Sequence, residues 1–160
     1  MGTHIQKDRT LTFTEADATP LDGTTTGRTF QADDRVATQS LIMSERCDKV
    51  AIDANLTGTD GNTVDFKIYG YSADGPAKLI YSGTATAGTA ISGTDKLYAD
   101  TFTAQTAGIW PEAITIVDSA ANRVASLVFD TRGVKYLVIE PGTFTTATSI
   151  TFRIREYGSV

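Results

Sequence analysis

Apolar and polar residues alternate with a period of two in the stretch that begins at Val50. The alternation runs from residue 50 to 56 and returns between 64 and 68, where Val64, Phe66 and Ile68 are separated by polar residues. This period predicts two β-strands, each with one buried face. The residues between them, 57–62, include two glycines and read as a turn. The sequence therefore predicts that the two strands pair as a hairpin.

Three apolar runs of strand length follow in the second half of the chain. They cover residues 113–117, 124–129 and 134–139, and each is rich in β-branched or aromatic side chains. Turn residues separate them at 118–122 and 130–133. Such runs are typical of consecutive antiparallel strands. We expect a meander in the middle of the core.

Further runs extend the same pattern. Residues 36–43 are a candidate strand or short helix, although they fit neither period well, and an Asp-Gly-Pro turn at 74–76 leads into a strand. The remaining predicted strands cover residues 79–86, 97–103 and 149–157. Pro141-Gly142 is expected to turn the chain before the last of them. About nine strands without a helical period predict an all-β fold, an antiparallel β-sandwich or jelly-roll-like single domain.

The first part of the chain differs from this pattern. Residues 1–34 are polar and rich in Thr and Asp, which predicts an extended N-terminal arm ahead of a β-sandwich domain over residues 35–160. The arm is either a disordered tail or a segment that orders against a neighbouring subunit. Apolar anchors that a solvated tail does not need favour the second reading: Leu11, Phe13, Leu21 and Phe30. Deletion of residues 1–30 would then leave a folded sandwich.

Composition and charge narrow the class of protein. Thr is about one residue in six and Gly is frequent, whereas Lys and Glu are sparse, which favours strands over helices. The net charge of −5 argues against partners that are polyanions, namely nucleic acids and anionic membrane surfaces. No apolar run approaches the roughly 20 residues of a membrane span. The first ten residues lack the apolar core of a secretory signal, so synthesis in a cytoplasm is expected.

Candidate chemistry is sparse. His4 is the only histidine and Cys47 the only cysteine, which leaves too few groups for a histidine-based triad or a closed zinc site. Cys47 is expected to be a small buried side chain. Residues 60–65, DGNTVD, place oxygen ligands at alternate positions, but they lack the long loop and closing Glu of a calcium site. We expect no catalytic, metal or cofactor residue, and no enzyme activity.

Aromatic residues offer candidate contacts for a partner. Tyr69 and Tyr71 share one face of a predicted strand, which is either an outer platform for sugars or a second packed layer, with packing favoured. Trp110 reads as a core or interface anchor. With the arm, the predicted partner-binding residues are Leu11, Phe13, Leu21, Phe30, Tyr69, Tyr71 and Trp110.

Two long segments carry a family resemblance. These are VAIDANLTGTDGNTVDFKIYGYSADG at 50–75 and KLYADTFTAQTAGIWPEAITIVDSAANRVASLVFDTRGVKYLVIEPG at 96–142. In style, over about residues 50–157, the chain resembles auxiliary virion proteins of tailed bacteriophages, the β-sandwich decoration (cement) proteins of the head. The likeness is a Thr-, Gly- and Ala-rich, acidic, all-β chain that ends soon after its last strand.

The resemblance implies a structural role at the head surface of a virion. Such a protein is made in the host cytoplasm, forms a homotrimer or another symmetric cluster, and clamps the lattice of the major capsid protein. Tail and baseplate structural components are a near alternative. A carbohydrate- or receptor-binding β-sandwich module is a further alternative, which exposed Tyr69, Tyr71 or Trp110 would favour.

Overall fold

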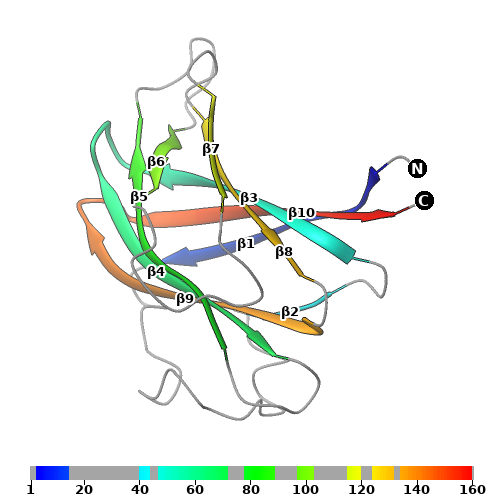
Figure 1. The fold of residues 1–160 in the computed structure, drawn as a ribbon. Coiled ribbons are helices and arrows are strands. Elements are labelled where there is room, and N and C mark those ends of the chain that lie inside the picture. Colours follow the sequence, from blue (N-terminus) through cyan, green and yellow to red (C-terminus); the bar gives the residue numbers. More distant parts are fainter. Residues whose placement is uncertain are drawn as a thin grey trace.

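The structure is a computed structural model, and it describes residues 3–14, 40–43, 47–71, 78–88, 97–102, 115–119, 124–131 and 134–159. The described part contains strands and no helix, and two antiparallel sheets pack face to face (Figure 1). The predicted all-β sandwich is confirmed. The strands are β1 (Thr3–Thr14), β2 (Ser40–Ile42), β3 (Cys47–Thr57), β4 (Thr63–Tyr71), β5 (Lys78–Ala87), β6 (Leu97–Phe102), β7 (Thr115–Ser119), β8 (Val124–Asp130), β9 (Tyr136–Thr145) and β10 (Ser149–Ser159).

Each sheet has a long strand at its centre, which names it below. In the β3 sheet, β10 lies between β1 and β3, and β8 joins β3 to β7. In the β4 sheet, β9 lies between β2 and β4, and β5 flanks β4 on the other side. Strand β6 links the two, because Tyr98 pairs with Asn55 of β3 while Phe102 pairs with Ala85 of β5.

The core between the sheets is built on aromatic rings from both of them. The ring of Phe66 on β4 lies 4.8 Å from that of Phe152 on β10, measured between centroids. It also lies 5.1 Å from Tyr81 and 6.0 Å from Phe102. Contacts at these separations favour tilted and edge-on rings. Phe66 therefore packs against aromatic rings of both sheets.

The predicted hairpin of residues 50–68 is wrong. Strand β3 pairs with β10, β8 and β6, whereas β4 pairs with β5 and β9. The turn between β3 and β4 carries the chain from one sheet to the other. Alternation shows that each strand has a buried face, but two such faces can lie side by side or oppose each other across the core. Here they oppose each other.

Asn62 holds this crossing in place. Its side chain is buried, and its Oδ1 accepts hydrogen bonds from Thr59 Oγ1 at 3.1 Å and Thr146 Oγ1 at 2.6 Å. Thr146 belongs to the connection from β9 to β10, which also crosses between the sheets. A side chain at Gly58 would collide with the Asn62 amide. One buried amide thus joins both crossings at this end of the sandwich.

The predicted meander is half right. Strands β7 and β8 pair in an antiparallel register from Thr115↔Val128 to Ser119↔Val124, as expected. Strand β9 leaves them and pairs with β4 and β2 in the other sheet. An apolar run buried on both faces does not encode which sheet it joins.

Pro141-Gly142 does not turn the chain either. Strand β9 runs through both residues to Thr145, and its register against β4 shifts between the pairs Phe66↔Pro141 and Val64↔Phe144. An extra residue on one strand is a β-bulge, and a bulge tolerates the missing N–H of a proline.

The first part of the predicted arm is a strand of the sandwich. Strand β1 pairs with β10 from Thr3↔Ser159 to Thr14↔Ser149. Phe13 is fully buried in the core, with its ring centroid 6.0 Å from that of Phe152. Residues 3–14 therefore do not form a separate arm, because their partner strand comes from the other end of the chain. Residues 15–34 of the predicted arm lie outside the described residues.

Candidate functional site

The outward face of the β4 sheet carries two rows of polar side chains. Phe66 points into the core, so its neighbours Asp65 and Lys67 point outward. Asp65 pairs with Thr84 of β5, and Lys67 lies between Ser82 of β5 and Glu140 of β9. Residues two apart on a strand are separated by about 7 Å, so a gap of that width lies between the rows.

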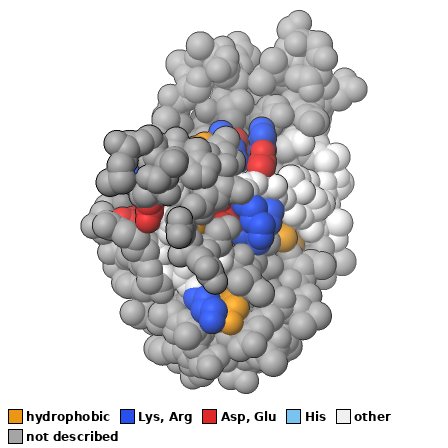
Figure 2. Space-filling view, turned by 90° about the vertical axis from the view of Figure 1, so that its right-hand side faces the viewer, with side chains coloured by type: hydrophobic (Ala, Val, Ile, Leu, Met, Phe, Trp, Pro, Cys, Tyr) orange, Lys and Arg blue, Asp and Glu red, His pale blue; other side chains and the backbone are white. Residues whose placement is uncertain are grey.

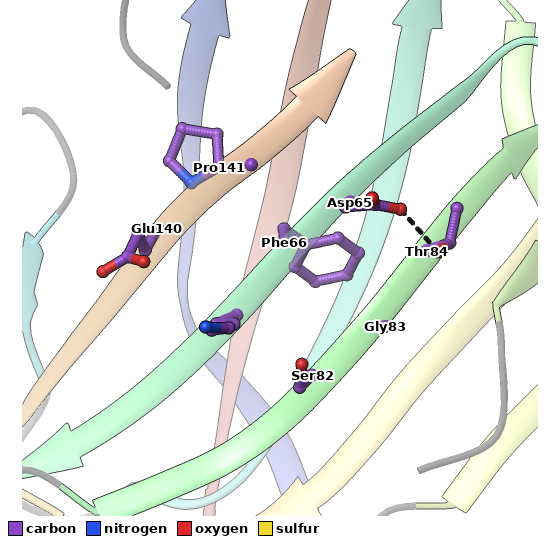
Figure 3. A pocket seen from close by; sticks show the side chains of 9 residues that line it. Asp65, Phe66, Ser82, Gly83, Thr84, Glu140 and Pro141 are labelled. Atoms are coloured by element: carbon purple, nitrogen blue, oxygen red, sulfur yellow. Dashed lines mark hydrogen bonds between the residues drawn. The ribbon is translucent and has the colours of Figure 1, made fainter. Parts of the chain in front are cut away.

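A hollow of about 420 Å³ fills this gap. Its floor is the backbone of Gly83, Phe66 and Pro141, which pair with one another across the three strands and put no side chain outward. Figure 3 shows Phe66 in the middle, Glu140 to one side and Asp65 with Thr84 to the other. The hollow is lined by Asp65, Phe66, Lys67, Ser82, Gly83, Thr84, Glu140, Pro141 and Gly142. Small-molecule sites have volumes of roughly 300–1,000 Å³.

The groups around the hollow suit hydrogen bonding. Thr84 Oγ1 donates to Asp65 Oδ1 at 2.6 Å (Figure 3), which orients the carboxylate. Glu140 is buried and Lys67 is half-buried. The lining therefore supplies carboxylate acceptors and an ammonium donor. The Ser82 hydroxyl can donate and accept, whereas the Thr84 hydroxyl donates to Asp65 and can still accept. None of the nine described residues that line it is a histidine or a cysteine.

An apolar cluster occupies another part of the same face. Tyr69 is only 2% exposed and packs with Tyr136 and Val138, against which the half-buried Leu79 also lies. Lys135 Nζ lies 5.6 Å from the centre of the Tyr136 ring, within cation–π range. The sequence allows Tyr69 to lie either on an outer platform or in a second packed layer, and it lies in the packed layer. An exposed sugar platform on Tyr69 is excluded by its burial.

The outward face of the β3 sheet carries charges that pair with each other. Arg155 on β10 donates from Nη2 to both carboxylate oxygens of Asp53 on β3, each at 2.7 Å, and Ser126 on β8 also donates to Asp53. Arg153 Nε lies 3.0 Å from both carboxylate oxygens of Asp8 on β1. These hydrogen bonds hold the pKa of Asp8 below its usual value. The pairs tie β1, β10, β3 and β8 together.

A further ion pair lies on the core side of the same strands. Arg9 on β1 pairs with Glu156 on β10, whose side chain is fully buried.

Cys47 is buried nearby, with its Sγ 3.2 Å from Thr131 Oγ1, and burial raises the pKa of this thiol. The predicted small buried thiol is confirmed. A raised pKa keeps the thiol protonated and a weak nucleophile.

Figure 2 looks at the end of the sandwich where the two termini lie. Among the described residues, Lys and Arg side chains lie beside Asp and Glu side chains on this face. The described part of this face therefore has no broad field of one sign.

The predicted partner-binding residues do not form one site. Phe13 lies in the central core and anchors β1 to its own chain, so it is not available to a partner. Leu11 is half-buried and packs against the same core, whereas Tyr69 lies beyond the opposite sheet. The backbone of Tyr71 pairs with that of Tyr136. The other three predicted contacts lie outside the described residues: Leu21, Phe30 and Trp110.

The sequence analysis missed the residues of the hollow. Lys67, Ser82, Thr84 and Glu140 are ordinary polar residues on strands, and no motif joins them. What they share is a position next to a core-facing residue on a strand. That position indicates a common site only when the order of β5, β4 and β9 in the sheet is known.

Within the described residues, no three His, Cys, Asp or Glu side chains are grouped so that they could hold a metal ion. The same part of the chain contains no helix long and apolar enough to cross a membrane.

Comparison with models of protein families, with curated proteins and with solved structures finds no match to this chain.

Proposed function

We propose that this chain is a non-enzymatic structural protein of a tailed-phage virion, which binds the lattice of the major capsid protein and stabilises it as a decoration (cement) protein. The observation that carries the proposal is the position of β1 at the edge of the β3 sheet. This strand is held along its length by β10, and both termini lie at the same end of the sandwich (Figure 1).

An edge strand is a natural surface for assembly. Among the described strands, β1 pairs only with β10, so its other side is the outer edge of the sheet. Backbone N–H and C=O groups at such an edge accept an added strand from another chain. A copy of the same chain would extend the sheet within a symmetric cluster, whereas a capsid subunit would be held directly. Several weak contacts in one cluster then add to firm attachment.

The sandwich also has the rigidity that a clamp requires. The ion pairs Arg153–Asp8 and Arg155–Asp53 fix β1 to the centre of the β3 sheet, so the edge is presented in one position. A preorganised surface loses less entropy on binding than a mobile one. The net charge of −5 suits a position outside the shell, away from the packaged genome. The family resemblance of residues 50–157 supports the same role.

Sedimentation of a lysate from the native source tests the proposal. The chain is followed through a density gradient by mass spectrometry. We expect it to travel with megadalton particles in a fixed ratio to the major shell protein, and that ratio separates a shell-wide decoration protein from a tail component. Recovery of the chain only as a small free species would contradict the proposal.

A charge placed on the edge strand tests the role of β1. Thr10 is exposed, and Thr10→Lys adds the kind of side chain that discourages edge pairing. We expect the variant to stay folded but to lose self-association or particle binding. Thr145→Lys, at an exposed position of β9, is the matched control and should bind normally. Equal binding by both variants would show that the β1 edge takes no part.

A further inference from the structure

We propose that the hollow on the outward face of β4, β5 and β9 is a binding site for a neutral saccharide, with room for one sugar ring. This is a ligand-binding activity beyond the proposed attachment to a capsid. It does not depend on that attachment.

The shape of the hollow suits a flat ring. The floor is the backbone of Gly83, Phe66 and Pro141, and no side chain of these three residues points outward from it. The two polar rows rise on either side, about 7 Å apart, as successive outward rows of a sheet do. A volume of about 420 Å³ accommodates a ring with its substituents.

The polar groups match the hydroxyl groups of a sugar. Each hydroxyl both donates and accepts, so it pairs best where donors and acceptors alternate. Asp65 and Thr84 form one wall, joined by their 2.6 Å hydrogen bond. The other wall is formed by Lys67 together with its cross-strand neighbours, Ser82 of β5 and Glu140 of β9. Neighbouring hydroxyls on one ring can therefore meet a carboxylate on one side and an ammonium on the other.

The charges disfavour an anionic ligand. An anion entering the hollow meets the carboxylates of Asp65 and Glu140, which outnumber the single ammonium of Lys67. Partly buried charges are weakly screened, so an anion carries an electrostatic penalty. A neutral polyhydroxyl compound avoids this penalty and still forms charge-assisted hydrogen bonds.

The site is held rigidly. Strand β4 is paired on both sides, with β5 and with β9, so the three strands that line the hollow form one continuous piece of sheet. The hydroxyl of Thr84 fixes the carboxylate of Asp65 before any ligand arrives. A preorganised site loses little entropy on binding, which is why shallow sites can still be selective.

Titration of the full-length chain by two-dimensional ¹⁵N NMR tests the proposal. The probes are glucose, galactose, mannose, N-acetylglucosamine and their β-linked dimers, with glucuronate as the anionic counterpart of glucose. We expect at least one neutral saccharide to give saturable shifts at residues 65–67, 82–84 and 140–142, with a Kd of about 1 mM. Glucuronate should bind at least about fivefold more weakly than glucose.

The variant Ser82→Ala/Thr84→Ala removes both hydroxyl groups and should weaken binding about tenfold. Thr10→Ala/Thr12→Ala removes two exposed hydroxyls from β1 and serves as the matched control, with unchanged binding expected. The same spectra show whether each variant is folded, and Lys67→Gln provides a second test if the double variant is not.

Three results would overturn the proposal. They are the absence of saturable shifts with every neutral saccharide, equal weakening by the control variant, and binding of glucuronate as tight as that of glucose. Particle sedimentation of Ser82→Ala/Thr84→Ala should match the unaltered chain in every case. Failure of saccharide binding is thereby distinguished from failure of the structural role.

Discussion

Polar side chains have different surroundings on the outward faces of the two sheets. On the β3 sheet, Arg155 and Ser126 converge on Asp53, which is only 8% exposed. On the β4 sheet, Asp65 is exposed and accepts a hydrogen bond from Thr84 of the neighbouring strand β5. Both aspartates occupy outward positions on the central strand of their sheet.

The difference separates a structural use of charge from a binding use. Charges that are paired across strands have already satisfied each other, so the β3 face stabilises the edge strand and offers little to a ligand. Polar groups that border an open hollow still face space that a ligand can fill. The kind of residue is the same on both faces, and the difference lies in whether it borders the hollow.

The largest effect is expected where β1 enters the core. Phe13→Ala removes a fully buried ring that contacts Phe152, and we expect a loss of about 3–5 kcal/mol in the free energy of unfolding. Urea denaturation measures this loss, and deletion of residues 1–14 should cost more. Thr12→Ala, at an exposed neighbouring position, is the control. A stable sandwich after the deletion would restore the separate-arm hypothesis.

The second effect concerns the closed part of the β4 face. Tyr69→Ala removes a buried ring from the cluster with Tyr136 and Val138, and we expect a loss of about 3 kcal/mol. Lys67→Ala, two residues away on the same face, should cost less than about 0.5 kcal/mol. Thermal unfolding compares the two variants. Similar losses for both would mean that this face is not divided into a packed part and an open part.

The third prediction tests the two aspartates directly. Asp53→Asn leaves the guanidinium of Arg155 without its counter-ion in a partly buried place, so we expect a loss of about 1–3 kcal/mol. Asp65→Asn keeps an acceptor for Thr84 and should change stability by less than about 0.5 kcal/mol. Denaturation of both variants under one condition makes the comparison. An equal loss would remove the distinction between the faces.

The smallest effect is the pH dependence of the β1 edge. The hydrogen bonds from Arg153 lower the pKa of Asp8 below 3.8 in the folded state. The contribution of the pair is therefore complete above about pH 4 and is lost as the pH falls through the folded pKa. Because both side chains are exposed, it is worth less than about 1 kcal/mol.

Hydrogen exchange of the β1 amides at about pH 5 and about pH 3 measures this loss. Exchange is corrected for its intrinsic pH dependence, and protection should fall at the lower pH. Asp8→Asn should remove most of the difference, whereas Asp60→Asn in the turn before β4 should preserve it. An undiminished pH dependence in Asp8→Asn would assign the effect to other carboxylates.

Strand identity was largely predictable from sequence, and strand order was not. The alternation of Val64, Phe66 and Ile68 correctly gave a strand with a buried face, because a period of two is a local property. Whether β4 pairs with β3 or opposes it depends on contacts across the core, which no local pattern records. The turn predicted at Pro141-Gly142 was wrong for a similar reason, because pairing of β9 with β4 overrides the local turn preference of these two residues.

The hollow was unpredictable for the same physical reason. Its walls combine residues from three strands that are brought together by the sheet, and Glu140 lies more than 70 positions after Lys67 in the sequence. Burial of Tyr69 was easier to anticipate, because an aromatic residue on a strand face favours packing. The burial of Phe13 in its own sandwich was harder to predict. Its apolar character is evident from the sequence, but its partner Phe152 lies far along the chain.

The pairing of β1 with β10 also sets the order of events during synthesis. The first strand leaves the ribosome before any of its neighbours in the sheet exist, and Asp8 must wait for Arg153, 145 residues later. Contacts of such sequence separation form slowly, and exposed edges in the interim invite aggregation. Leu11 and Phe13 therefore have no partner strand until β10 has been made, so the synthesis of β10 is the step that allows β1 to join its sheet.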